Sequence, residues 1–184
     1  MRLDAVAAVA AAVLPGFGSA VVADPPWVAS LRATSASFAA MLRKLSVAGL
    51  LLMAVALLGL LQIKSLLASS PAGIALQVAA IGLMIWARAT FGRRSFHGAA
   101  NPTPGGLVTG GPYRFIRHPI YTAACLFGWV GVISNWSLPA LGLGILLLIG
   151  AFIRMLCEEK LVTEAYPEYR QYARATKRMV PHVF

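Results

Sequence analysis

The sequence predicts an all-α protein, built as a polytopic bundle of membrane-spanning helices. Of its 184 residues, 59% are hydrophobic and only 12% are charged. A soluble domain of this length needs more polar residues to cover its surface. The mean hydropathy is +0.75, and several stretches approach the roughly 20 apolar residues that cross a bilayer core. We therefore expect an integral membrane protein with about five spans and a helical C-terminal tail in the cytoplasm.

Five apolar stretches are candidates for these spans. We interpret the first as a membrane helix rather than a signal peptide, because it is long, follows a single arginine and precedes further spans. Two short connections, at residues 69–71 and 135–137, each join two antiparallel helices as a hairpin. The predicted spans are residues 3–23, 45–67, 72–90, 119–134 and 138–156.

The segments outside the spans are more polar. Residues 24–44 carry an arginine and several hydroxyl side chains, and their apolar residues recur at helical spacing. They predict a helix in the membrane interface, with a re-entrant or tilted span as the alternative. After Glu159 the chain becomes polar and aromatic, which predicts a helix broken at Pro167 and a second short helix.

The net charge of +10 comes mainly from cations at the ends of the spans. This placement is typical of the cytoplasmic side of membrane proteins, so we expect anionic lipids as partners and no nucleic acid. If both hairpin tips point outward, the other span ends share one cytoplasmic face, and the N-terminus lies outside. In a prokaryote this multi-pass protein would lie in the plasma membrane. The cations at these ends are Arg43, Lys44, Arg88, Arg93, Arg94, Arg114, Arg117 and Arg154.

Reactive and acidic side chains are scarce. The two cysteines lie in or beside apolar runs and indicate neither a disulfide framework nor a metal site. Six residues are acidic, and none lies between Asp24 and Glu158. Glu158 and Glu159 follow Arg154 by about one helical turn, where the fifth span ends. A structural Arg154–Glu158 pair and a functional site are equal alternatives here, and Glu159 should point elsewhere.

The stretch GPYRFIRHPIY gathers polar and aromatic residues directly before the fourth span. Pro119 suits the first turn of a helix, which puts His118 at the N-cap, where free N–H groups and the positive helix end favour an anion. Tyr121, in the first turn, offers a ring face or a hydroxyl. Anchoring at the membrane interface is the alternative. We favour anchoring for Tyr113 and Arg114, and we leave both interpretations open for the histidine and Tyr121.

Together, the two clusters indicate a ligand with a carboxylate, a cationic centre and hydroxyl groups. A helix N-terminus with cations would take the carboxylate, and a glutamate would take an ammonium or ribose hydroxyls. Aromatic faces would cover a flat base or a cation. This profile fits S-adenosylmethionine, and physical reasoning alone does not select it over another zwitterion.

Three motifs, in order along the chain, carry a resemblance to a known family. LVTGGPYRFIRHPIY is followed after one hairpin by RMLCEEK and then by YPEYRQY. This arrangement closely resembles the isoprenylcysteine carboxyl methyltransferases, whose wider relatives include membrane phospholipid N-methyltransferases. The likeness implies a methyltransferase core with cofactor pocket and tail over residues 72–184, after N-terminal membrane helices over residues 1–71. The Gly-x-Gly pair of the phospholipid enzymes is reduced here to Gly82, which weakens that branch of the likeness.

The resemblance implies S-adenosyl-L-methionine as cofactor and a lipophilic acceptor that enters from the bilayer. The implied reaction is carboxyl O-methylation of a prenylcysteine-like or other lipophilic acceptor, with phospholipid or amine N-methylation as the alternative. Arg154 and Glu158 are the implied catalytic residues: the first would lie near the acceptor's carboxylate, and the second could help to deprotonate an amine. The implied cofactor-binding residues are Leu107, Val108, Gly111, His118, Pro119, Tyr121, Glu158, Glu159, Tyr169 and Tyr172.

Three rival functions are compatible with parts of the sequence. A membrane reductase of the steroid-reductase kind would bind NADPH, and its extra phosphate would need the cations Arg170, Arg174, Lys177 and Arg178. A non-catalytic scaffold explains the hydrophobicity but not the concentration of polar residues in two patches. A transporter is less favoured, because the spans lack charges at the membrane midplane.

Overall fold

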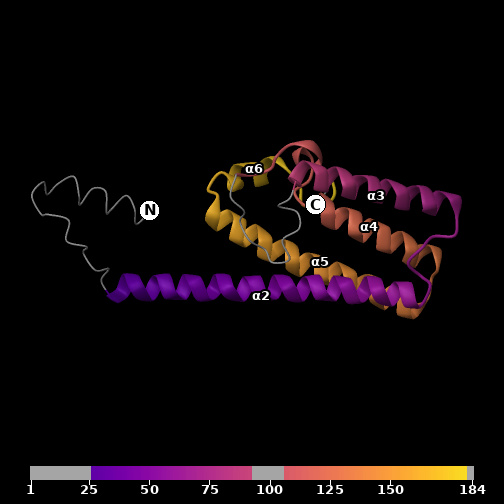
Figure 1. Ribbon diagram of the computed structural model, residues 1–184, viewed down its shortest axis with the longest axis horizontal. Helices are drawn as coiled ribbons and strands as arrows, with labels where there is room; N and C mark the ends of the chain where they lie inside the picture. The colour runs from indigo at the N-terminus through magenta and orange to yellow at the C-terminus, as the bar shows by residue number, and fades with distance from the viewer. Residues whose placement is uncertain (1–25, 93–105, 182–184) are drawn as a thin grey trace, which may run out of the picture. The chain divides into compact units, whose positions relative to one another are not determined.

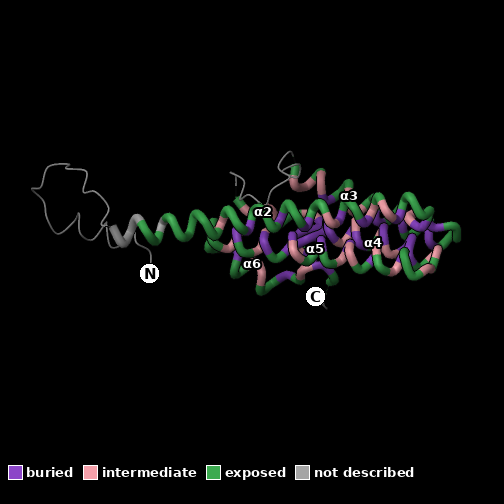
Figure 2. Tube along the Cα trace, turned by 90° about the horizontal axis from the view of Figure 1, so that it is seen from below, coloured by how far each residue is buried: buried purple, intermediate pink, exposed green. Residues whose placement is uncertain are grey.

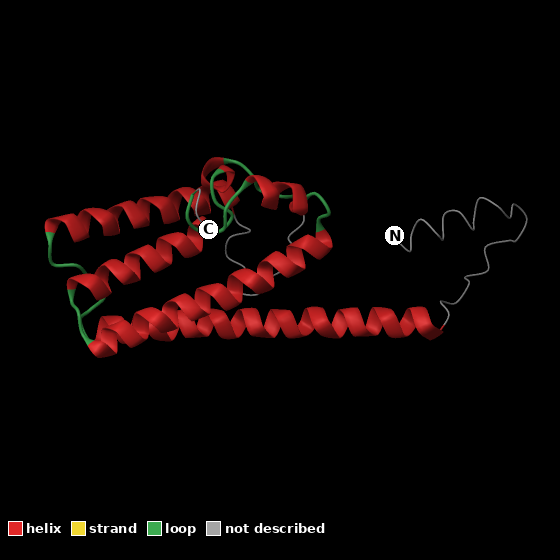
Figure 3. Cartoon of the chain, turned by 180° about the vertical axis from the view of Figure 1, so that it is seen from behind, coloured by secondary structure: helices red, strands yellow, loops and turns green. Residues whose placement is uncertain are grey.

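The computed structural model describes residues 26–92 and 106–181, and within these ranges the chain is helical without strands, as predicted (Figure 3). One isolated parallel bridge pairs Ile116 with Lys177. The predicted first span, residues 3–23, lies outside the described ranges. The helices are α2 (Pro26–Gln62), α3 (Pro71–Phe91), the short 3-10 helix η2 (Gly111–Arg114), α4 (Pro119–Ser134), α5 (Leu138–Ala165) and α6 (Tyr169–Ala175).

The chain divides into two compact units, residues 1–36 and residues 37–184, and the candidate site lies in the second. Three helical stretches are long and apolar enough to cross a membrane: Ala33–Gln62, Pro71–Phe91 and Leu138–Ala165. α4 is also apolar but has 16 residues. At 1.5 Å per residue it extends about 24 Å, which is less than the roughly 30 Å of a bilayer core.

The segment predicted as a separate interfacial helix, residues 24–44, differs from the prediction. Its described part belongs to α2, which continues without a break to Gln62. The alanines, leucines and basic residues of this segment favour helix throughout. Its hydroxyls do not interrupt the helix, since Thr34 Oγ1 bonds back to the Ser30 carbonyl at 2.9 Å. The interfacial and spanning segments therefore form one helix.

The starts of the helices are set by capping residues and prolines. Ser70 and Ser137 each accept a hydrogen bond from the backbone N–H three residues further on, at 3.1 and 3.3 Å. His118 is the N-cap of α4 and Pro119 follows it, as predicted, although the imidazole makes no capping bond. The break at Pro167, between α5 and α6, is also confirmed. α5 itself extends past the predicted end of its span to Ala165.

The connection between α2 and α3 is longer than predicted, because α2 already ends at Gln62. The backbone reverses at Lys64, which adopts a left-handed conformation with φ of 58°. Gln77, buried in α3, donates to the Leu66 carbonyl at 2.7 Å and to the Phe127 carbonyl on α4 at 3.1 Å. One buried amide thus joins the connection to both helices and satisfies backbone groups that would otherwise be unpaired in an apolar environment.

In the second unit, α4 packs between α3 and α5, and α2 packs against α5 (Figure 1). The contact between α2 and α5 depends on two glycines: a Cβ on Gly150 would lie 2.7 Å from the Gly49 carbonyl oxygen. Buried residues concentrate between the helices, and exposed residues cover the outside (Figure 2). The main core cluster comprises Met53, Ala56, Tyr121, Cys125, Leu147, Ala151, Met155 and Met179.

Candidate functional site

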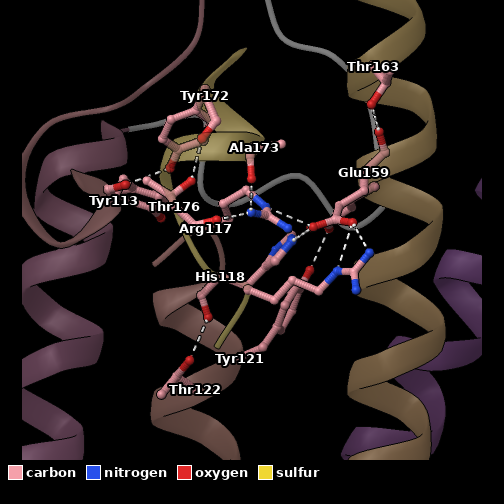
Figure 4. Close-up of polar contacts among 12 residues, drawn as sticks. Tyr113, Arg117, His118, Tyr121, Thr122, Glu159, Thr163, Tyr172, Ala173 and Thr176 are labelled. Atoms are coloured by element: carbon pink, nitrogen blue, oxygen red, sulfur yellow. Dashed lines mark hydrogen bonds and ion pairs between the residues drawn. The ribbon is translucent and has the colours of Figure 1, made fainter. Parts of the chain in front are cut away.

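The structure brings the two predicted motifs together at one end of the bundle, where α4 begins and α5 ends. Tyr121, in the first turn of α4, donates its hydroxyl to Glu158 Oε1 at 2.5 Å. His118 Nε2 lies 3.3 Å from Glu159 Oε1 (Figure 4). The antiparallel hairpin of α4 and α5 causes this convergence, because it returns α5 past the start of α4. Two pairs of residues that are far apart in the sequence therefore form one cluster.

Arg154 lies inside this cluster rather than at the end of a span. Its side chain is 7% exposed, and its Nε donates to the Tyr121 hydroxyl at 2.6 Å. The same nitrogen lies 3.3 Å from Glu158 Oε1, so the predicted pair with Glu158 is formed. The guanidinium also donates to the Ser46 carbonyl of α2 at 3.4 Å. α2, α4 and α5 thus all contribute to the surroundings of one buried cation, whose charge Glu158 balances.

Glu158 is the more open of the two adjacent glutamates. Its side chain is 24% exposed, whereas that of Glu159 is 13% exposed. Its contacts with Tyr121 and Arg154 both fall on Oε1. Within the part of the chain that the structure describes, Oε2 accepts no hydrogen bond. Glu158 therefore has one carboxylate oxygen with which it can bind a hydroxyl or an ammonium group.

Glu159 faces a different set of partners, as its position on the helix predicts. Arg117 Nε lies 3.0 Å from Oε1, and Arg178 NH2 lies 3.0 Å from Oε2. With His118 also close to Oε1, both oxygens of this carboxylate are engaged by groups from α4 and the C-terminal tail. The two neighbouring glutamates thus have different roles in the cluster: one retains an open oxygen, and the other is enclosed.

The predicted tail residues pack beside the cluster. Tyr172 donates its hydroxyl to the Tyr113 carbonyl at 2.6 Å, and its ring meets that of Tyr169 edge-on at 5.8 Å. Burial raises the pKa of Tyr172 to about 12, and it also raises the pKa of Tyr113. Tyr113 is buried against Phe91, with ring centroids 5.4 Å apart. It is therefore a packing residue and not the exposed interface anchor that we expected.

The remaining predicted residues lie in the segment before α4. Val108 is half-buried, and Gly111 adopts a φ of 56°, which favours glycine. A Cβ on Gly111 would also lie 2.5 Å from Thr90 Oγ1 of α3, so glycine lets this segment lie directly against α3. Leu107 and Tyr172 line the same open pocket of about 500 Å³, which is completed by Thr109, Glu168, Gln171 and Ala175.

Arg117, Arg178 and a stretch of tail that we name the C-terminal strap, residues 176–179, were not predicted as site residues. The strap crosses the start of α4: Arg117 N donates to the Lys177 carbonyl at 2.8 Å, and His118 N to the Arg178 carbonyl at 2.9 Å. The available sequence signal was Met179, an apolar residue that follows a basic run and is buried in the core.

Comparison with known proteins agrees with this geometry. The family model described as phospholipid methyltransferase matches residues 69–169. The cobalt-zinc-cadmium resistance protein CzcN of Cupriavidus metallidurans is 35% identical over 80 residues, which are 42% of this chain and 36% of that protein. The match thus spans little more than a third of this relative, and no solved structure matches the chain. Because the family model covers more than half of its residues, the chain belongs to the phospholipid methyltransferase family, a family of integral membrane methyltransferases related to the isoprenylcysteine carboxyl methyltransferases.

Proposed function

We propose that this protein transfers a methyl group from S-adenosylmethionine to the carboxylate of a lipophilic, prenylcysteine-like acceptor. The observation that carries the proposal is the convergence of His118 and Tyr121 with Glu158 and Glu159 at one end of the bundle. When bound, S-adenosylmethionine supplies a methyl group on a sulfonium centre, which an oxygen or nitrogen nucleophile can attack. We further propose that this end of the bundle faces the cytoplasm, close to anionic lipids.

The residues of the cluster fit such a cofactor. The open Oε2 of Glu158 suits the cofactor's ribose hydroxyls or its ammonium group, since an ionised carboxylate accepts several hydrogen bonds. Arg117, Arg154 and Arg178 outnumber the two glutamates, so the cluster keeps positive charge with which it can attract the cofactor's carboxylate. The rings of His118 and Tyr121 stack at 5.7 Å and offer an aromatic surface beside these charges.

The contribution of the protein to methyl transfer is alignment and the exclusion of water, because the displacement needs no protein nucleophile. An acceptor carboxylate is already ionised near pH 7, so it needs no general base. Arg154 would orient that carboxylate. Because Glu158 already balances the guanidinium, the ion pair with the acceptor would be weak enough to leave its oxygen nucleophilic. Exposed apolar side chains on the outer faces of the helices allow a hydrocarbon chain to arrive from the lipid.

Amine N-methylation is the second candidate, and the match to the phospholipid methyltransferase family model supports it. An amine acceptor must lose a proton before or during the reaction. Glu158, with its open oxygen at the cluster, is the residue that would receive this proton. The two candidates therefore assign the same cofactor site but different tasks to Glu158.

The test is to incubate the purified protein with radiolabelled S-adenosylmethionine and a membrane lipid extract, and then to treat the labelled product with base. Base hydrolyses a methyl ester to volatile methanol, whereas an N-methyl group resists it. Release of volatile label supports carboxyl methylation, and label that stays in the lipid supports the amine alternative. Thermal stabilisation by NADPH and not by S-adenosylhomocysteine would instead support a reductase and contradict both.

A further inference from the structure

We infer that Glu159, Arg117 and Arg178 form an ionic latch, which holds the C-terminal strap across the start of α4 and thereby positions His118 and Tyr121. In this assignment Glu159 is a positioning residue for the cofactor site and not a direct contact of the cofactor. The contacts of the latch exist within the chain itself. Only its effect on cofactor affinity rests on the proposed function.

The carboxylate of Glu159 is the centre of the latch. Oε1 accepts from Arg117 Nε at 3.0 Å and lies 3.3 Å from His118 Nε2. Oε2 accepts from Arg178 Nε at 3.1 Å and lies 3.0 Å from its NH2. The guanidinium of Arg178 therefore meets one oxygen with two nitrogens. Charge-assisted bonds of this kind are stronger than neutral ones, and they leave Glu159 little capacity for a ligand.

Arg117 connects this carboxylate to the tail. Its NH1 donates to the Ala173 carbonyl at 2.9 Å and also to the Thr176 carbonyl (Figure 4). The Arg117 side chain thus joins α5, the end of α6 and the first residue of the strap. With only 9% of it exposed, this side chain cannot readily exchange these partners for water.

The strap lies directly on the residues that we assign to cofactor binding. His118 N donates to the Arg178 carbonyl at 2.9 Å, and Thr122 Oγ1 donates to the Met179 carbonyl at 2.9 Å. Met179 is buried in the same core cluster as Tyr121. A strap that lifts away would therefore release the backbone of His118 and remove a packing partner of Tyr121.

A double-mutant cycle distinguishes a latch from a direct contact. We would measure the affinity for S-adenosylhomocysteine by calorimetry in Glu159→Gln, in Arg178→Ala and in the double variant. The latch predicts that each single change weakens binding about tenfold and that the double variant is no weaker than either, because both remove the same interaction. Lys177→Ala is the matched control: it removes one charge from an exposed neighbouring side chain and should leave affinity unchanged. Normal affinity in Arg178→Ala, or additive losses in the double variant, overturns the latch.

Hydrogen exchange tests the latch without any ligand. The amides of Arg117 and His118 bond to strap carbonyls, so they should exchange at least tenfold faster in Glu159→Gln and Arg178→Ala, and at the wild-type rate in Glu158→Ala. Arg178→Lys, which keeps the charge, should restore part of the protection and covers the case in which the alanine variant does not fold. Unchanged exchange in the latch variants overturns the inference. Failure of the wild-type protein to bind S-adenosylhomocysteine, with faster exchange in these variants, refutes the proposed function and leaves the latch standing.

Discussion

The hydroxyl of Tyr121 joins the two charged residues that the helices enclose: it donates to Glu158 Oε1 at 2.5 Å and accepts from Arg154 Nε at 2.6 Å. The phenol thus bridges a guanidinium on α5 to a carboxylate one turn further along the same helix. Since Tyr121 belongs to α4, the bridge also fixes α4 against α5. Fold stability and the geometry of the candidate site therefore depend on the same atom.

Removal of this oxygen should affect both properties. In Tyr121→Phe the ring remains, but Arg154 loses a buried hydrogen-bond acceptor, and such a loss costs about 1–3 kcal/mol of unfolding free energy. The affinity for S-adenosylhomocysteine should fall as well, because Glu158 loses the donor that holds Oε1. Unfolding in denaturant and calorimetric titration of the same preparation measure the two effects. Wild-type stability in the variant would contradict the bridge.

The contact between α2 and α5 predicts a difference between two glycines of α5. A Cβ on Gly150 would lie 2.7 Å from the Gly49 carbonyl, so Gly150→Ala must push the helices apart and should cost about 1–3 kcal/mol of stability. Gly142→Ala is the control, because nothing lies within 4 Å of its added Cβ. It should stabilise the helix by about 0.5–1 kcal/mol. Thermal unfolding of the two variants tests this, and equal shifts would refute the close crossing.

The buried tail tyrosine predicts a loss of stability at high pH. Burial raises the pKa of Tyr172 from 10.0 to about 12, so in the unfolded chain this phenol ionises first. Its contribution to stability is therefore complete below pH 10 and is lost as the pH rises from 10 to 12. Tyr172→Phe should have a lower unfolding temperature at neutral pH, since its bond to the Tyr113 carbonyl is gone, but a smaller decline over this range. An equally steep decline in the variant would contradict the assignment.

The sequence was sufficient to predict the features that depend on neighbouring residues. Pro119 after His118 marks the start of α4, and the spacing of Arg154 and Glu158 predicts their pair. The adjacent glutamates were separable in advance for the same reason, because neighbouring residues on a helix point about 100° apart. Such local signals need no knowledge of the tertiary structure.

The features that sequence reasoning missed depend on long-range contacts. The strap pairs with the start of α4 largely through backbone groups, which leave no residue-specific pattern. Tyr113 looked like an interface residue, because its burial depends on Phe91 from the preceding helix. The extent of α2 was missed for a different reason: hydroxyl residues made residues 24–44 look unsuited to a span, although they are compatible with a continuous helix.

The central claim is that the start of α4 and the open glutamate of α5 bind one methyl donor. The most direct measurement is the calorimetric affinity of S-adenosylhomocysteine for the wild-type protein and for His118→Ala, Glu158→Ala and Glu164→Ala. Glu164 is an exposed glutamate on the same helix, so its replacement controls for the loss of charge. The account predicts at least tenfold weaker binding in the first two variants, which should remain folded, and wild-type affinity in the third. Unchanged affinity in folded His118→Ala or Glu158→Ala would contradict it.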